Sequence, residues 1–136
     1  MSLVTIAADA SIDVVTGTKA PHIAGDFLAG EDLHALAFCY IKSDGKVYLT
    51  DATALGEAAR LAGVTPKAVK AGQIVELLGL GTRMRYAASG LTPGAPLYLA
   101  TTAVGAGKLD TAATTGDPAG KLQALTDTDI RIVAAI

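Results

Sequence analysis

The chain has 136 residues, a formal net charge of −2, 51% hydrophobic residues and only 4% aromatic residues. This length predicts one domain that can bury a core without cross-links, and the charge gives no electrostatic reason to expect nucleic acid or an anionic membrane as a partner. No stretch approaches the roughly 18 apolar residues of a membrane span, the first residues lack the basic and apolar regions of a signal peptide, and the single cysteine excludes an intrachain disulfide.

The first 29 residues predict an N-terminal arm. Ser11 to Val14 alternate in polarity, as a short strand does, but glycines and a proline interrupt the segment up to Gly30. Apolar side chains near a chain end usually need a surface to cover them. We therefore expect an arm over residues 1–29 that contacts a partner, and a β domain over residues 30–136. The expected contact residues of the arm are Leu3, Val4 and Ile6.

A hairpin is predicted next. Leu33 to Ile41 is a dense apolar run, and Val47 to Thr50 is the return strand. Asp44-Gly45 lies between them, and this dipeptide between β-prone runs is a strong hairpin signal.

One short helix is expected, over Ala54 to Ala62. Thr53 can cap its start, Glu57 and Arg60 suit its two ends, and Gly63 can take the left-handed closing position.

Further short strands follow at close spacing. Bends at glycines separate them, and Asp129 to Ile132 alternate in polarity. Many short strands with frequent turns favour an all-β fold, here a small β-barrel or sandwich. The expected strands are 73–78, 82–87, 97–100 and 108–112, with strands again over 122–136.

A pattern of turns and strands occurs twice. Gly30 to Thr53 and Gly90 to Thr114 share a glycine-led turn, an apolar strand, a Gly-Lys turn and a strand that closes on Ala-Thr. The offset of about 60 residues exceeds most solenoid repeats, so we interpret the pattern as two copies of one β unit.

Candidate chemical groups are few. Cys39 with His22 or His34 could form a nucleophile and its base, but a small residue in an apolar strand favours a buried structural thiol. Asp127 and Asp129 could bind calcium or serve as acid and base, although a solvated strand face is the stronger interpretation. No spacing predicts a metal site, and we expect no catalytic residue and no cofactor.

Gly79-Leu-Gly-Thr82 resembles a phosphate loop only in part. The segment lacks the third glycine, the Lys-Ser/Thr pair and a following helix, so a bend between strands is the stronger interpretation.

A basic group is the remaining candidate. It contains Lys67, Lys70, Arg83 and Arg85. Arg83 and Arg85 share one strand face, with Met84 and Tyr86 on the other. Two arginines on one face can bind an acidic partner surface, or can belong to a solvated exterior.

The chain resembles a viral family. The segment Gly90-Leu-Thr-Pro-Gly-Ala-Pro-Leu-Tyr-Leu-Ala-Thr-Thr looks like one that recurs in tailed-phage structural proteins. The stretches that begin at Ser43-Asp-Gly-Lys-Val-Tyr, Glu57-Ala-Ala-Arg-Leu and Lys70-Ala-Gly-Gln-Ile-Val are similar to small phage capsid cement (head decoration) proteins. The resemblance covers about Gly30 to Val133.

This resemblance implies a β-barrel or β-tulip domain that forms a homotrimer on the outer capsid surface, with an N-terminal arm. The implied partners are the major capsid protein and other copies of the chain, without nucleic acid or membrane. The expected protein is made in the host cytoplasm, stays in the virion and is not an enzyme. A trimeric module of a tail, fibre or baseplate is the alternative, because the Gly90 segment is shared with such proteins.

Overall fold

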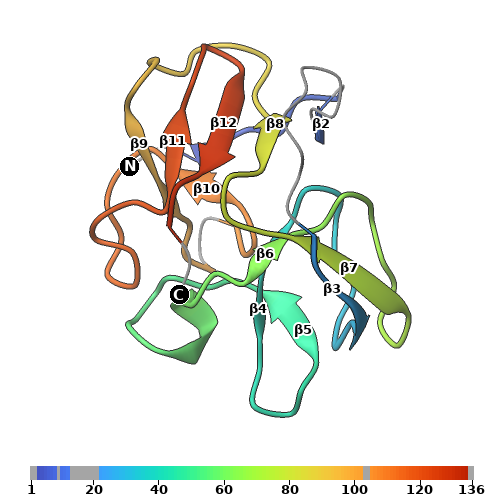
Figure 1. Ribbon diagram of the computed structural model, residues 1–136. Helices are drawn as coiled ribbons and strands as arrows, with labels where there is room; N and C mark the ends of the chain where they lie inside the picture. Colours follow the sequence, from blue (N-terminus) through green and yellow to red (C-terminus); the bar gives the residue numbers. More distant parts are fainter. Residues whose placement is uncertain (1–2, 9, 13–21, 103–104, 135–136) are drawn as a thin grey trace.

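The computed structural model describes residues 3–8, 10–12, 22–102 and 105–134. Its backbone is nearly all β and forms two sheets, which lie in the upper and lower halves of Figure 1. The expected all-β, barrel-like fold class is therefore confirmed.

The upper sheet has seven strands in the order β1-β10-β9-β11-β12-β8-β2. Their bounds are β1 Leu3–Val4, β2 Ser11–Ile12, β8 Arg83–Arg85, β9 Pro96–Leu99, β10 Leu109–Asp110, β11 Leu122–Ala124 and β12 Asp129–Ile132. The lower sheet has five strands in the order β3-β7-β6-β4-β5. Their bounds are β3 His22–Leu28, β4 Phe38–Ile41, β5 Val47–Leu49, β6 Gly63–Val64 and β7 Ile74–Leu78.

The five-stranded sheet closes on itself. Its two outer strands are β3 and β5. Ala29, directly after β3, forms a parallel bridge with Val47 of β5, and the Gly30 amide donates to the Val47 carbonyl at 2.9 Å. This contact turns the sheet into a small barrel. Its interior is filled by short apolar side chains, among them Ala37, Cys39, Val47, Val75 and Leu77.

The seven-stranded sheet is curled. A flat sheet would separate its outer strands by six strand spacings, about 29 Å, yet β1 and β2 are joined by a short piece of chain. Val4 and Ser11 are seven residues apart, and seven residues span at most about 25 Å even when the chain is fully extended. The sheet must therefore bend to bring its edges closer together.

The N-terminal residues belong to these sheets, which corrects the expected arm. β1 pairs with β10, β2 with β8 and β3 with β7. Val4 is 5% exposed and lies in the core of the seven-stranded sheet. The described part of residues 1–29 is thus a component of both sheets, and the division at residue 30 does not mark a structural boundary. Pairing partners that lie 46 to 107 residues away leave no local signal in the sequence.

The predicted hairpin is confirmed. β4 and β5 pair antiparallel with Tyr40 opposite Tyr48, and Gly45 has the left-handed φ of 84° that the Asp-Gly turn requires.

The repeated pattern has a structural counterpart. Cys39 lies opposite Leu49 in the β4–β5 hairpin, and Leu99 lies opposite Leu109 in the β9–β10 pair. Both partners are shifted by 60 residues between the two pairs, so the register is the same. The two hairpins also touch, because the Phe38 amide donates to Gly107 and the Gly107 amide donates to Thr50.

The first half of β4 joins the two cores, because Phe38 and Cys39 are buried on its opposite faces. Cys39 points into the barrel, whereas Phe38 lies in the large core beneath the seven-stranded sheet. There its ring lies 5.7 Å from the ring of Tyr86. A strand buried on both faces ties the two sheets into one packed unit.

The expected helix is much shorter than predicted. Only Glu57–Ala59 form a helical turn, of the 3-10 type, and no side chain caps it. Gly56 has φ 152° and ψ −164°, a backbone conformation that is essentially restricted to glycine and does not belong to a helix. Gly63 does not close a helix but lies in β6, where a Cβ atom would come within 2.7 Å of the Leu78 carbonyl oxygen.

Candidate partner-binding surface

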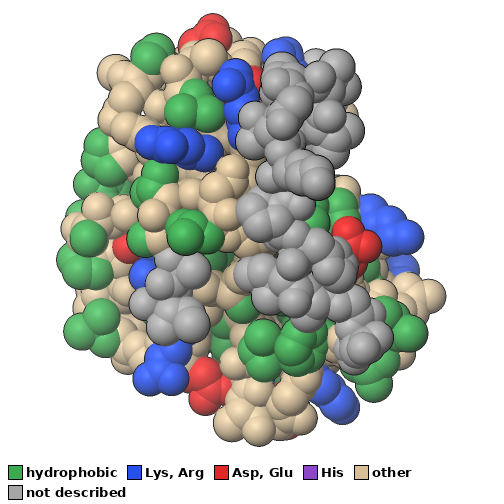
Figure 2. Space-filling view, viewed as in Figure 1, with side chains coloured by type: hydrophobic (Ala, Val, Ile, Leu, Met, Phe, Trp, Pro, Cys, Tyr) green, Lys and Arg blue, Asp and Glu red, His purple; other side chains and the backbone are tan. Residues whose placement is uncertain are grey.

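The outer face of the seven-stranded sheet carries the predicted arginines. Met84 is fully buried, whereas Arg83 and Arg85 on either side of it are partly exposed. This alternation confirms that the two arginines share one face of β8. In Figure 2, Lys and Arg side chains gather over the region of β12 and β8 in the upper part of the molecule.

Strand register brings a third arginine to this face, one that we did not predict. Arg131 of β12 lies directly opposite Arg83 and is exposed. The alternation of Asp129 to Ile132 in the sequence places Arg131 on one side of a strand, but it does not reveal the neighbouring strand. We define Arg83, Arg85 and Arg131 as the arginine face.

Two side-chain pairs organise the arginine face. Nε and one terminal nitrogen of Arg83 donate to one carboxylate oxygen of Asp129, at 3.2 and 3.0 Å. Nε and one terminal nitrogen of Arg131 donate to the Gln123 amide oxygen, at 3.1 and 2.8 Å. Arg83 therefore has a charged partner, and Arg131 has a neutral one.

The basic group seen in the sequence divides in space. Lys70 lies 3.8 Å from Asp32, and both side chains are exposed. Asp32 and Lys70 line a hollow next to the barrel residues Leu33 and Val69, whereas the arginine face lies on the other sheet.

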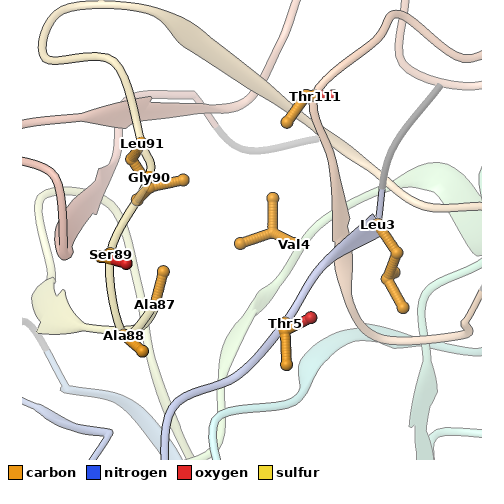
Figure 3. Close-up of a pocket in the computed structure, with 9 residues that line it drawn as sticks. All are labelled: Leu3, Val4, Thr5, Ala87, Ala88, Ser89, Gly90, Leu91 and Thr111. Carbon is orange, nitrogen blue, oxygen red and sulfur yellow. The ribbon is translucent and has the colours of Figure 1, made fainter.

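The apolar N-terminal residues contact the protein itself. Val4 is buried, and Ile6 packs against the same core. Leu3 and Val4 line a hollow of about 250 Å³ against residues 87–91, and Figure 3 shows Val4 pointing into the space between β1 and that segment. Of the three predicted arm contacts, Leu3 and Ile6 are thus half-buried and Val4 is not available to a partner.

An exposed apolar pair lies on the barrel wall, and we did not predict it. Leu28 of β3 and Ile74 of β7 are direct cross-strand partners, with 42% and 66% of their surfaces exposed. Adjacent apolar side chains on one sheet face are suited to a protein contact. Sequence alone could not pair residues from these two distant strands.

The candidate nucleophile is part of the barrel core. Cys39 is fully buried, and its thiol lies 3.4 Å from the Ala37 carbonyl oxygen. Burial, with a smaller contribution from Glu31, raises the pKa of the Cys39 thiol far above its ordinary value. Nδ1 of His34 is bonded to the Ala35 carbonyl oxygen, and the His22 side chain lies outside the described residues. The expected burial of the Cys39 thiol in an apolar strand is confirmed.

The candidate acidic pair does not lie on one strand. Asp127 is exposed in the turn before β12, whereas Asp129 begins β12 and binds Arg83.

Within the described ranges, no group of three His, Cys, Asp or Glu side chains could hold a metal ion. The described residues also include no helix with the length and apolar character to cross a bilayer.

Asp117 is a buried acidic residue whose carboxylate binds backbone groups of the fold. It is 1% exposed, and its carboxylate accepts the backbone N–H groups of Leu99, Gly120 and Lys121. These bonds fasten the loop between β10 and β11 to β9.

The segment Gly79-Leu-Gly-Thr82 is a bend from β7 to β8, because the Thr82 hydroxyl and amide both donate to the Gly79 carbonyl.

A scan against models of known protein families, a search of curated proteins and a search of solved structures each returned no match.

Proposed function

We propose that the protein is a structural virion protein that binds the outer surface of a phage capsid and stabilises it. The observation that carries the proposal is an all-β domain whose exterior displays an apolar cross-strand pair and an arginine face. Arginine is enriched in protein contacts, and adjacent exposed apolar side chains mark a surface that a partner can cover. The resemblance of the chain to capsid cement proteins gives the partner, the major capsid protein.

Stabilisation follows from mass action. A protein that binds the assembled shell, but not its separated subunits, makes the shell harder to open by an amount that depends on its affinity and concentration. No chemical reaction is needed for this role. The Leu28–Ile74 pair is the candidate contact, because removing its exposed apolar surface from water favours binding.

A module of a tail, fibre or baseplate is the second candidate. The segment from Gly90 resembles one shared by several tailed-phage structural proteins, and it supplies the turn before β9 and β9 itself. This position in the larger sheet is compatible with either assembly.

The test uses shells assembled from the major capsid protein encoded in the same genome, and tail tubes from that genome as the second target. We expect the protein to co-sediment with shells and to raise their melting temperature. Ile74→Asp should weaken this binding by at least about tenfold, because it places a charge in the apolar contact.

Leu55→Asp is the matched control. Leu55 is 74% exposed and lies outside the strands, so the same change there should leave binding intact. Binding to tail tubes and not to shells would overturn the capsid proposal. Equal binding by both variants would show that the Leu28–Ile74 pair is not the contact.

A further inference from the structure

Arg83 and Arg131 form a like-charge pair across two strands. Their Cα atoms are register partners in the antiparallel β8–β12 ladder, an arrangement that costs stability because like charges repel. Asp129 offsets the charge of Arg83 through a contact of 3.0 Å. Arg131 has only the neutral Gln123 amide as its hydrogen-bond partner within the described residues, so its charge is not offset in the same way.

The Arg131 guanidinium is held in place. The Gln123 amide nitrogen donates to the Gly94 carbonyl at 3.2 Å, which turns the amide oxygen toward Arg131. A guanidinium has five N–H donors, and the bonds to Gln123 use Nε and one terminal nitrogen. The remaining donors are fixed in direction by the same contact and can bind a further acceptor.

A hollow of about 330 Å³ opens beside this guanidinium. Its wall includes Gln123 and Arg131, together with Pro96 and the exposed Val133. Val133 is 40% exposed. The hollow thus joins a fixed cation to apolar walls, a combination that suits a carboxylate on a short aliphatic arm.

We propose that Arg131 and this hollow bind an acidic side chain of an extended segment from a partner protein. A glutamate carboxylate would accept hydrogen bonds from Arg131, while its methylene groups would lie against Pro96 and Val133. Nucleic acid is the less suitable ligand, because its binding rests on many phosphate contacts, and the arginine face already contains the Asp129 carboxylate. This inference concerns the chemistry of the ligand and does not depend on the capsid proposal.

The probe is a fluorescein-labelled hexaglutamate peptide, measured by fluorescence anisotropy at low ionic strength. The wild-type protein should bind it, and added NaCl should weaken binding by screening. Arg131→Gln should weaken binding at least about tenfold, because one charge-assisted bond is lost. Arg60→Gln removes the same charge at an exposed position after the 3-10 turn and should change the affinity less than about twofold.

Gln123→Glu separates binding from folding. The new carboxylate would lie against Arg131 and occupy its donors, so the peptide should bind as weakly as it does to Arg131→Gln. The same variant should keep the melting temperature of the wild type, because the new ion pair with Arg131 offsets the lost hydrogen bond from Gln123 to the Gly94 carbonyl. A loss of peptide binding in a protein as stable as the wild type cannot come from unfolding.

Three results would overturn the inference. They are equal affinities of Arg131→Gln and Arg60→Gln, wild-type affinity of Gln123→Glu, and tighter binding of a labelled hexathymidylate than of hexaglutamate. The last result would identify a phosphate ligand. In the expected case, nuclear magnetic resonance should show the largest peptide-induced shifts at Gly94, Gly120 and the Gln123 amide, which surround the hollow.

Discussion

Tyr86 places a hydroxyl in the large core without a hydrogen-bond partner among the described residues. Its side chain is fully buried and packs against Phe38. An unpaired buried hydroxyl costs about 1–3 kcal/mol. Tyr86→Phe should therefore increase the free energy of unfolding by about 1 kcal/mol in urea denaturation. Tyr98→Phe, at a half-buried position, is the control and should have little effect. A destabilised Tyr86→Phe would reveal an internal water bound to the hydroxyl.

Residue burial could be predicted where the signal is local. Cys39 lies within an apolar run, and Arg83 and Arg85 alternate with Met84 along one strand, so sequence predicted their environments correctly. The sequence did not predict that Arg131 shares this face, because that depends on the pairing of β12 with β8, which lies about 45 residues earlier in the chain. The chemistry of the hollow comes from β9, β11 and β12 together and has no continuous motif.

At the scale of elements, turns were easier to predict than the helix or the first strands. The Asp44-Gly45 turn is specified by its own two residues. The residues from Ala54 to Ala62 have helix-compatible ends, but their neighbours satisfy backbone groups elsewhere: the Ala52 amide donates to Ala100, and the Ala62 amide donates to Cys39. Leu61 is fully buried in the large core. Tertiary contacts therefore override a local helix preference.

β1 is an element whose loss should damage the whole sheet. Val4 is buried, β1 pairs with β10, and the nearby Ala7 amide donates to the Tyr86 carbonyl. Val4→Ala should lower the free energy of unfolding by about 1–2 kcal/mol, and removal of residues 2–8 should lower it further. Thr5→Ala changes an exposed side chain in the same segment and should be neutral. Thermal melting of the three variants measures this, and an intact melting temperature after truncation would restore the idea of a separate arm.

At the scale of the whole molecule, we predict a homotrimer or another closed homo-oligomer. The chain combines 51% hydrophobic residues with exposed large apolar side chains outside the Leu28–Ile74 pair, among them Ile41 and Leu80, and closed symmetry covers such surfaces without leaving them open to further growth. Sedimentation equilibrium should give a mass above that of one chain. A strictly monomeric wild type at high concentration would disprove the prediction.

The pairing of β1 at one edge of the larger sheet has a consequence for synthesis on the ribosome. Leu3 and Val4 pair with Asp110 and Leu109, so β1 has no partner until the ribosome has added the 105 residues that separate Val4 from Leu109. Early nascent chains must keep an apolar N-terminus exposed or in transient contacts, which favours late folding and a risk of aggregation. The larger sheet therefore cannot be completed before β10 has been synthesised, although its edge strand β1 leaves the ribosome long before that.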